Sequence, residues 1–324
     1  MICNIGRVGD TILSNAILDS AFRTCATVDY IGGKQNMELL YADTRLEQVT
    51  VVRNSFAGFA SVLKTILRAR YDGFIGIKDC YSSTNLIMAA IIRSRVKTGW
   101  NGERFRPFHR DVRSISVPAI HKVEMMRRIG QLAGLEAGEY KPSLIVAPKA
   151  IEEFRRKNEW DKPFILLNLS ATDASARMWP VENWTRYVQG CGLTEERILV
   201  NGLPRDRHLV DYVCEKLPGA VAFQAKGFMD VAAAIAHARL VMSVDTGVVH
   251  ACSALDTPVV AFYCGGEFAI KYGPLSTWGL AIQAPVGYRV PDIPVEQAIA
   301  ETQRHGLPPG IVGRQRPSTV SSRT

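Results

Sequence analysis

One short stretch of the sequence places a carboxylate, a hydroxyl, a glycine and an imidazole within six residues: Asp245, Thr246, Gly247 and His250. The apolar run 240–244 before it is typical of a buried parallel strand, so the stretch predicts a strand that turns into a helix. The free N–H groups and the positive dipole end at the start of a helix bind phosphate. We therefore predict a diphosphate site, the alternative being an ordinary helix cap at Asp245 and a core histidine at His250.

A second turn follows the first apolar run of the chain and reads Gly6-Arg7-Val8-Gly9-Asp10. A dinucleotide-binding turn would read G-x-G-x-x-G, and here an acidic residue stands where a phosphate would lie. Asp10 would repel pyrophosphate. Its carboxylate is either a helix cap or a general base that faces a substrate.

Two further turns carry polar groups after predicted strands. The loop from Asn168 to Pro180 contains Thr172 and Arg177, and an arginine can bridge phosphate oxygens as a fork or simply lie on the surface. The turn after the strand 197–201 contains Asp206, which could accept hydrogen bonds from ribose hydroxyls or cap the next helix.

The elements that must position these turns alternate between short β-rich runs and helical stretches in both halves of the chain. The expected strands are 2–5, 28–31, 48–52, 74–78, 114–117, 164–169, 197–201, 220–223, 240–244, 258–263 and 280–283. Strands of this apolar kind are covered by helices on both faces. We predict an α/β fold of two doubly wound Rossmann-like domains facing across a cleft, with domains at 1–148 and 149–312 and a disordered tail at 313–324.

Composition limits the function classes. The 324 residues are 47% hydrophobic and 22% charged, as in ordinary globular proteins, and they suffice for two cores. The apolar runs are shorter than the roughly 18–20 residues of a spanning helix, and the N-terminus lacks an apolar signal core, so we predict a cytoplasmic protein. Seven scattered cysteines without a C-x-x-C pair indicate buried free thiols rather than disulfides or a zinc site.

Taken together and in order, the four turns resemble the ADP-heptose:lipopolysaccharide heptosyltransferases, glycosyltransferase family 9, which have the GT-B fold. The family motifs are a Gly-Asp turn, a Lys-x-Trp-Pro loop, a Gly-x-Pro-x-Glu turn and an Asp-Thr-Gly-x-x-His helix start. The matching segments here are Gly9-Asp10, Arg177-Met178-Trp179-Pro180, Gly202 to Asp206, and Asp245 to His250. Arg177 replaces the family lysine and Asp206 the family glutamate; both keep the charge, and either could alter donor preference.

The resemblance implies a role for each position. Asp10 would deprotonate the acceptor hydroxyl, and Asp206 would contact the nucleoside ribose. The donor diphosphate would be held by Thr172, Arg177, Thr246 and Gly247, with Asp245 and His250 beside it. The implied reaction is an inverting transfer of heptose from ADP-heptose to a lipopolysaccharide core or a related cell-surface glycan. The sequence contains no Asp-x-Asp metal motif, so we expect a metal-independent enzyme with no cofactor besides the nucleotide sugar.

Charge is distributed unevenly along the chain. The first 150 residues carry 21 basic and 13 acidic residues, whereas the rest carries 18 of each, so the excess of +8 lies in the first half. Such an excess indicates an anionic partner: nucleic acid, anionic lipid or a phosphorylated glycan. The densest part, 93–113, also contains Trp100, Phe105 and Phe108.

In the fold that the chain resembles, this half binds the acceptor. We therefore expect contact with a lipid-linked phosphorylated glycan and, peripherally, with the anionic inner face of the cytoplasmic membrane, but not with nucleic acid. The residues expected to form this surface are Arg104, Arg106 and Arg110.

Other function classes fit the sequence less well. Asp-Thr-Gly also occurs in aspartic proteases, but these need two such carboxylates in an all-β setting, and this chain has one copy between α/β elements. A nicotinamide-dependent oxidoreductase would show G-x-G-x-x-G after its first strand. The remaining alternatives are a glycosyltransferase with another nucleotide sugar and a non-catalytic nucleotide-binding protein.

Overall fold

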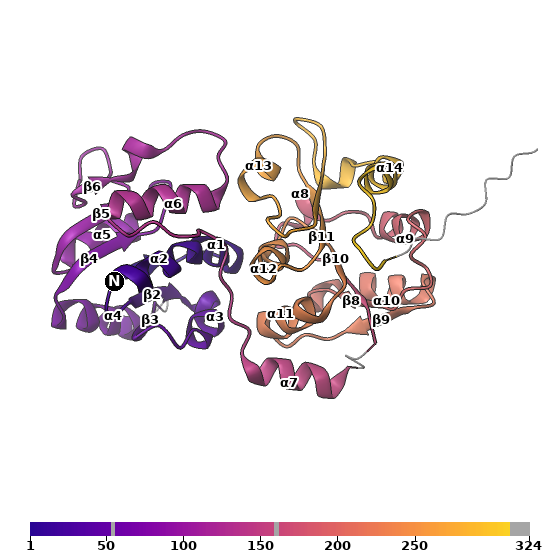
Figure 1. Ribbon diagram of the computed structural model, residues 1–324, viewed down its shortest axis with the longest axis horizontal. Coiled ribbons are helices and arrows are strands. Elements are labelled where there is room, and N and C mark those ends of the chain that lie inside the picture. The colour runs from indigo at the N-terminus through magenta and orange to yellow at the C-terminus, as the bar shows by residue number, and fades with distance from the viewer. Residues whose placement is uncertain (53–55, 159–161, 312–324) are drawn as a thin grey trace, which may run out of the picture. The chain divides into compact units, whose positions relative to one another are not determined.

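The computed structural model describes residues 1–52, 56–158 and 162–311 (Figure 1). The chain divides into two compact units. The first contains Met1–Ile151 with the short segments Ser253–Leu255 and Ile270–Tyr272, and the second contains Glu152–Cys252, Asp256–Ala269 and the chain from Gly273 onward. The tail predicted at 313–324 lies outside the described residues.

The first unit is built on a parallel sheet of six strands in the order β3-β2-β1-β4-β5-β6. The strands are β1 (Ile2–Asn4), β2 (Asp29–Gly33), β3 (Gln48–Val52), β4 (Tyr71–Gly76), β5 (Ser94–Gly99) and β6 (Arg110–Asp111). The helices are α1 (Val8–Ser14), α2 (Leu18–Thr24), α3 (Met37–Ala42), α4 (Phe56–Arg68), α5 (Ser83–Ile91) and α6 (Lys122–Ala133). Consecutive strands run outward from β1 to β3 and then return to its other side with β4.

Both faces of this sheet are buried. On β1, Ile2 packs into a core cluster with residues of α1, α2, α3 and α6. The next residue, Cys3, points to the opposite face and packs with residues of α4 and α5. Alternate residues of one strand thus enter two different cores, which is why the strand sequences read as apolar throughout.

The second unit repeats this topology, with the order β12-β11-β10-β7-β8-β9 and all neighbours parallel. The strands are β7 (Ile165–Asn168), β8 (Ile198–Asn201), β9 (Ala220–Phe223), β10 (Leu240–Val244), β11 (Val259–Tyr263) and β12 (Gly279–Gln283). The helices are α7 (Pro148–Lys157, which begins just before this unit), α8 (Ala174–Arg177), α9 (Val181–Gly190), α10 (Arg207–Lys216), α11 (Phe228–His237), α12 (Gly247–Leu255), α13 (Phe268–Tyr272) and α14 (Val295–His305).

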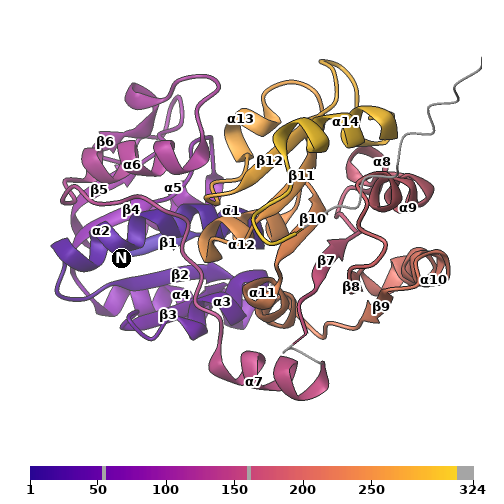
Figure 2. The same cartoon turned by 45° about the vertical axis from the view of Figure 1, so that its right-hand side comes forward.

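Helices cover both faces of the second sheet as well. Trp184, Tyr187 and Phe262 form the centre of a core cluster to which α9, α10 and α14 contribute. Figure 2 shows α11 and α12 on the other side of the strands. In each sheet the chain reverses direction beside the strand that comes first, between β1 and β4 and between β7 and β10. In open α/β sheets, ligands bind beyond the carboxyl ends of the strands at such a switch point.

The predicted α/β class with two doubly wound sheets is confirmed, and the strands β3, β9 and β10 match the predicted ranges. Two local predictions were wrong. The expected strand 114–117 does not form. Residues Val112–Ile115 form a 3-10 turn instead, because the Asp111 carboxylate accepts a hydrogen bond from the Arg113 backbone N–H and bends the chain there. The strand β5 was not predicted, since its Arg95 and Lys97 resembled a charged loop although they alternate with Val96 and Thr98.

Candidate functional site

Buried polar side chains join the carboxyl ends of three strands of the second sheet. Asn168 ends β7, and its Nδ2 donates hydrogen bonds to Ser243 Oγ on β10 at 3.0 Å and to the Ser170 carbonyl at 3.2 Å. Its Oδ1 accepts a hydrogen bond from Asn201 Nδ2, at the end of β8, at 2.7 Å. The network therefore fixes the three strand ends relative to one another at the switch point. Sequence reasoning missed all of these residues as site residues, although two asparagines at the last positions of apolar strands were a visible signal.

The network continues to the start of α12. Ser243 Oγ lies 3.3 Å from Thr246 Oγ1, and Thr246 is the N-cap of α12, where its hydroxyl accepts a hydrogen bond from the Val248 N–H. The residue that caps α12 is therefore Thr246. The alternative interpretation, in which Asp245 is the helix cap, is wrong. Gly247 is the first helical residue, so the backbone at the helix start carries no side chain. His250 is in the first turn of α12 and is buried.

Arg177 brings a positive charge to this helix start. It ends the short helix α8, which Asp173 caps by accepting a hydrogen bond from the Ala176 N–H. Arg177 Nη1 lies 3.2 Å from Asp245 Oδ2 and donates to the Asp245 carbonyl at 3.4 Å. The Arg177 side chain is 29% exposed while that of Asp245 is 5% exposed, so the arginine is anchored at one end and accessible at the other.

The charge of Asp245 also acts on the neighbouring strand. Tyr263 ends β11 and is completely buried. Burial first, and the Asp245 carboxylate second, raise the pKa of the Tyr263 phenol well above its usual value. The phenol therefore stays neutral, and the negative charge at this strand end belongs to Asp245 alone.

The turn after β8 is connected to the loop after β7. Asp206 is buried at the end of a 3-10 turn, and its side chain does not cap α10, so the predicted helix-cap role is not formed. Its Oδ2 lies 3.6 Å from Arg205 Nε and accepts no hydrogen bond within the described residues. Arg205 Nη2 donates to the carbonyls of Ala171, at 2.6 Å, and Thr172, at 3.4 Å. Thr172 is exposed, and its side chain is left accessible.

Asp10 lies at the corresponding edge of the first sheet. The strand β1 ends at Asn4, and α1 begins at Val8 with Arg7 as its N-cap. Asp10 is in the first turn of α1, and its carboxylate neither caps the helix nor forms a hydrogen bond or ion pair within residues 1–52, 56–158 and 162–311. The cap interpretation is therefore wrong, and the half-buried carboxylate is chemically available.

Known proteins similar to this chain identify its family. The model of glycosyltransferase family 9 (heptosyltransferase) matches residues 59–277. This chain belongs to glycosyltransferase family 9. It is 32% identical over 96 residues to lipopolysaccharide heptosyltransferase 1 of Salmonella typhimurium, a match that spans 29% of the chain and 30% of that protein. Membership of the family makes the chain a glycosyltransferase.

Solved structures show the family fold over nearly the whole chain. E. coli heptosyltransferase WaaC with ADP aligns with a TM-score of 0.75 at 17% identity, over 94% of this chain and 99% of that one. The family 9 glycosyltransferase from Veillonella parvula gives 0.76 at 17% identity, over 94% and 95%. E. coli ADP-heptose heptosyltransferase II gives 0.72 at 16%, over 94% and 97%. The GT-B fold class is thereby confirmed.

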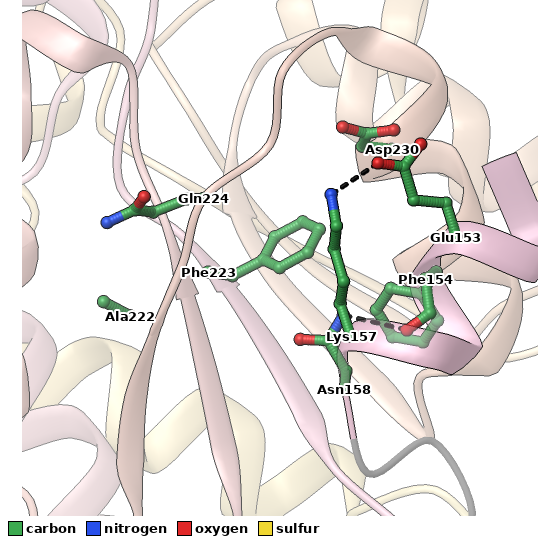
Figure 3. Close-up of a pocket in the computed structure, with 8 residues that line it drawn as sticks. All are labelled: Glu153, Phe154, Lys157, Asn158, Ala222, Phe223, Gln224 and Asp230. Atoms are coloured by element: carbon green, nitrogen blue, oxygen red, sulfur yellow. Dashed lines mark hydrogen bonds and ion pairs between the residues drawn. The ribbon is translucent and has the colours of Figure 1, made fainter.

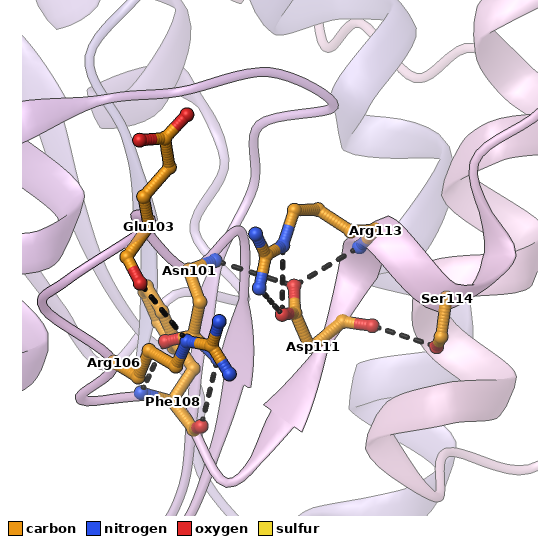
Figure 4. Close-up of polar contacts among 7 residues, drawn as sticks. All are labelled: Asn101, Glu103, Arg106, Phe108, Asp111, Arg113 and Ser114. Carbon is orange, nitrogen blue, oxygen red and sulfur yellow. Dashed lines mark hydrogen bonds and ion pairs between the residues drawn. The ribbon is translucent and has the colours of Figure 1, made fainter.

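The loop within the basic stretch 93–113 is held in place by internal hydrogen bonds (Figure 4). The Asn101 carboxamide donates to the Phe108 carbonyl at 3.1 Å and accepts from the Phe108 N–H at 3.0 Å. Arg104 and Arg106 are exposed, whereas Arg110 is half-buried and donates to the Leu132 carbonyl at 2.8 Å. The structure thus leaves Arg104 and Arg106 on the surface but uses Arg110 to hold α6.

The aromatic residues of this stretch, like its arginines, are divided between the core and the surface. Phe108 is buried and stacks on Phe74, and Trp100 packs against the core of the first unit. Phe105 is 51% exposed. Of the three aromatic residues, Phe108 is therefore part of the core and Trp100 packs on it, while Phe105 lies on the surface.

A hollow of about 220 Å³ lies elsewhere in the second unit, at the carboxyl end of β9 (Figure 3). It is lined by Glu153, Phe154, Lys157, Asn158, Ala222, Phe223, Gln224 and Asp230. Its acidic Glu153 already binds two ammonium groups, those of Lys157 and Lys226. None of the predicted donor residues lines it, so the switch point remains the candidate site.

The described chain has neither a cluster of metal-binding side chains nor a helix that could span a membrane. Among residues 1–52, 56–158 and 162–311, His, Cys, Asp and Glu side chains do not gather in groups of three or more that could hold a metal ion. Within the same residues, every helix is too short or too polar to cross a bilayer.

Proposed function

We propose that this chain transfers heptose from ADP-heptose to a lipopolysaccharide core or a related cell-surface glycan, with inversion and without a metal ion. The observation that carries the proposal is the Arg177 guanidinium, which Asp245 holds at the capped start of α12 in a member of glycosyltransferase family 9. The printed names of its relatives support the donor and the acceptor, since they include a lipopolysaccharide heptosyltransferase and a heptosyltransferase solved with ADP.

The donor would bind with its diphosphate at the start of α12. There the Gly247 backbone N–H, the Thr246 hydroxyl and the remaining N–H groups of Arg177 can donate to phosphate oxygens. A guanidinium has five N–H donors, and the ion pair and hydrogen bond to Asp245 described above use Nη1, so other donors remain for a diphosphate. These positive groups would stabilise the charge that develops on the leaving ADP, the task that a metal performs in other enzymes.

The nucleoside would extend toward the end of β8. Asp206 is buried there with a carboxylate oxygen that accepts no hydrogen bond within the described chain, as expected for a group that binds ribose hydroxyls. Arg205 holds Asp206 and the Thr172 loop at the same time, so it would fix the two sides of the nucleotide site.

In the reaction, the acceptor oxygen forms a bond to the anomeric carbon while the bond from that carbon to the diphosphate breaks. A single displacement of this kind inverts the anomeric centre. Asp10 would take the proton of the attacking hydroxyl, because its carboxylate is half-buried and unpaired in the described structure. ADP leaves with the electron pair of the broken bond.

The acceptor would approach the first unit from an anionic membrane surface. The first half of the sequence carries the whole excess of +8, and the exposed Arg104 and Arg106 belong to it. We expect them to contact phosphorylated glycan or anionic lipid headgroups at the inner face of the cytoplasmic membrane, with the chain bound peripherally.

The test is to incubate the chain with ADP-heptose, other ADP-sugars and UDP-sugars, with a heptose-free lipopolysaccharide acceptor, and to measure both nucleotide release and glycan product. We expect product from ADP-heptose, with inverted anomeric configuration by NMR and unchanged yield in EDTA. Loss of activity in EDTA that Mg²⁺ restores would refute the metal-free mechanism. Tight ADP binding without any product would instead identify a non-catalytic nucleotide-binding protein.

A further inference from the structure

A lysine stands beside the proposed base at the switch point of the first sheet. Lys78 follows β4, and Asp10 follows β1, the neighbouring strand. A Cβ placed on Gly6 would lie 3.3 Å from Lys78 Nζ, 3.4 Å from the Asp10 Cβ and 3.2 Å from Asn4 Oδ1. The three side chains therefore converge on residue 6, where even a Cβ would be in tight contact with them.

Within the described residues Lys78 forms no ion pair with its neighbours in the sequence, although its charge contributes to the lowered pKa of the adjacent Asp79. The adjacent Asp79 is bound instead by Lys122, whose Nζ lies 2.7 Å from Asp79 Oδ1 and whose side chain is only 8% exposed. Burial opposes ionisation of Asp79, but the Lys122 charge and hydrogen bond outweigh it, so the pKa of the Asp79 carboxyl lies below its usual value. Asp79 thus stays charged and fully engaged with Lys122.

Lys78 and Asp10 do not pair with each other either. Within residues 1–52, 56–158 and 162–311, the Lys78 ammonium has no carboxylate within 4.0 Å and makes no side-chain hydrogen bond. A half-buried ammonium without a partner is costly, and at the ligand-binding edge of a doubly wound sheet the natural partner is an anion of the ligand. The positive excess of this half of the sequence favours an anionic ligand as well.

We propose that Lys78 binds an anionic group of the acceptor, a carboxylate or a phosphate, close to the hydroxyl that Asp10 deprotonates. The inference rests on the proposed function and narrows its acceptor: the sugar that receives the transferred residue carries a negative charge next to its nucleophilic hydroxyl. Lys78 orients that sugar for attack and selects against neutral sugars, while Asp10 takes the proton. A side chain at residue 6 would press on Lys78 and Asp10, so Gly6 keeps the two groups accessible.

The experiment compares wild type with Lys78→Met, Lys78→Arg and the matched control Lys64→Met, which removes one exposed lysine from α4 of the same unit. Each protein is titrated by calorimetry with a heptose-free lipopolysaccharide acceptor, with its methyl-esterified form and with its dephosphorylated form. Acceptor KM and kcat are then measured with ADP-heptose.

We expect Lys78→Met to weaken acceptor binding and raise acceptor KM by about 10- to 100-fold, the loss of one charge-assisted hydrogen bond. The kcat and the ADP Kd should change little, Lys78→Arg should restore most of the affinity, and Lys64→Met should behave as wild type. Wild type should lose the same affinity for whichever treated acceptor lacks the recognised anion, and Lys78→Met should not discriminate against it.

Three outcomes overturn the inference: an acceptor affinity that Lys78→Met leaves unchanged, an equal loss for the charged and neutralised acceptors, or wild type that does not bind the acceptor. If wild type binds the acceptor through Lys78 but transfers no sugar, the proposed function fails while this site stands. A shift of the kcat pH profile without a KM effect would assign Lys78 to the base instead, and would also overturn it.

Discussion

Replacing Asn168 with alanine should loosen the whole donor site, because this one side chain joins the ends of β7, β8 and β10. The change removes the hydrogen bonds to Ser243 at 3.0 Å, to the Ser170 carbonyl at 3.2 Å and from Asn201 at 2.7 Å. At about 1 kcal/mol for each bond, the free energy of unfolding of the second unit should fall by about 3 kcal/mol. For a domain of this size that corresponds to a melting temperature lower by roughly 6–12 °C.

The same change should reach the nucleotide. Ser243 Oγ, which lies 3.3 Å from Thr246 Oγ1, loses the hydrogen bond that it accepts from Asn168, so the cap of α12 becomes less ordered. The ADP Kd should then rise roughly tenfold, about 1.4 kcal/mol. Differential scanning calorimetry and ADP titration measure the two effects. The control is Asn183→Ala on α9, which we expect to change stability by no more than about 0.5 kcal/mol. If Asn168→Ala melts and binds ADP as this control does, the network has no role in positioning the site.

Three further changes test other parts of the structure. Asp10→Asn should lower turnover by roughly 10² to 10⁴ with the ADP Kd unchanged, and near-normal turnover would remove Asp10 from the mechanism. Charge reversal of Arg104 and Arg106 should weaken binding to anionic vesicles by at least about tenfold and raise the acceptor KM. Charge reversal of the half-buried Arg110 should mainly destabilise the first unit. Equal vesicle binding by wild type and the double variant would contradict the membrane proposal. Asp79→Asn should destabilise the first unit at pH 7, because its buried lysine partner loses the opposite charge. The pKa of Asp79 is depressed in the folded protein, so the stabilisation that its carboxylate provides is present above its ordinary pKa of 3.8 and is lost as pH falls through the lower folded pKa. The melting temperatures of wild type and variant should therefore converge below the folded pKa. A difference that stays constant with pH would refute the ion pair.

Local sequence patterns were sufficient to predict most of the strands, although not β5, and the turn at Asp245, because the chemistry of that turn lies within six consecutive residues. The pairing of Arg177 with Asp245 joins residues 68 positions apart, and only the family resemblance placed them together. The network from Asn168 to Ser243 could not be predicted, since it depends on which strands are neighbours in the sheet and in which register.

In the basic stretch 93–113, the local sequence pattern was misleading about which aromatic residues are buried. Alternating basic and aromatic residues suggested a surface, but Phe108 fits against Gly99 and Gly76, where a Cβ would lie 2.4 Å and 3.0 Å from its ring. Those glycines belong to β4 and β5, so the pocket for Phe108 exists only once these strands have paired. The burial of an aromatic residue was thus decided by two distant glycines and not by its own neighbours in the sequence.

The switch point of the second sheet also has a consequence during synthesis. The central strand β7 can pair with β8 soon after it leaves the ribosome, but its other partner, β10, follows about 70 residues later, since Asn168 and Ser243 are 75 positions apart. In that interval β7 presents an open edge whose residues, Ile165 to Leu167, are buried on both faces in the finished unit. An unpaired apolar edge is a template for association with other chains. Chains interrupted before Leu240 should therefore aggregate more readily than the complete chain.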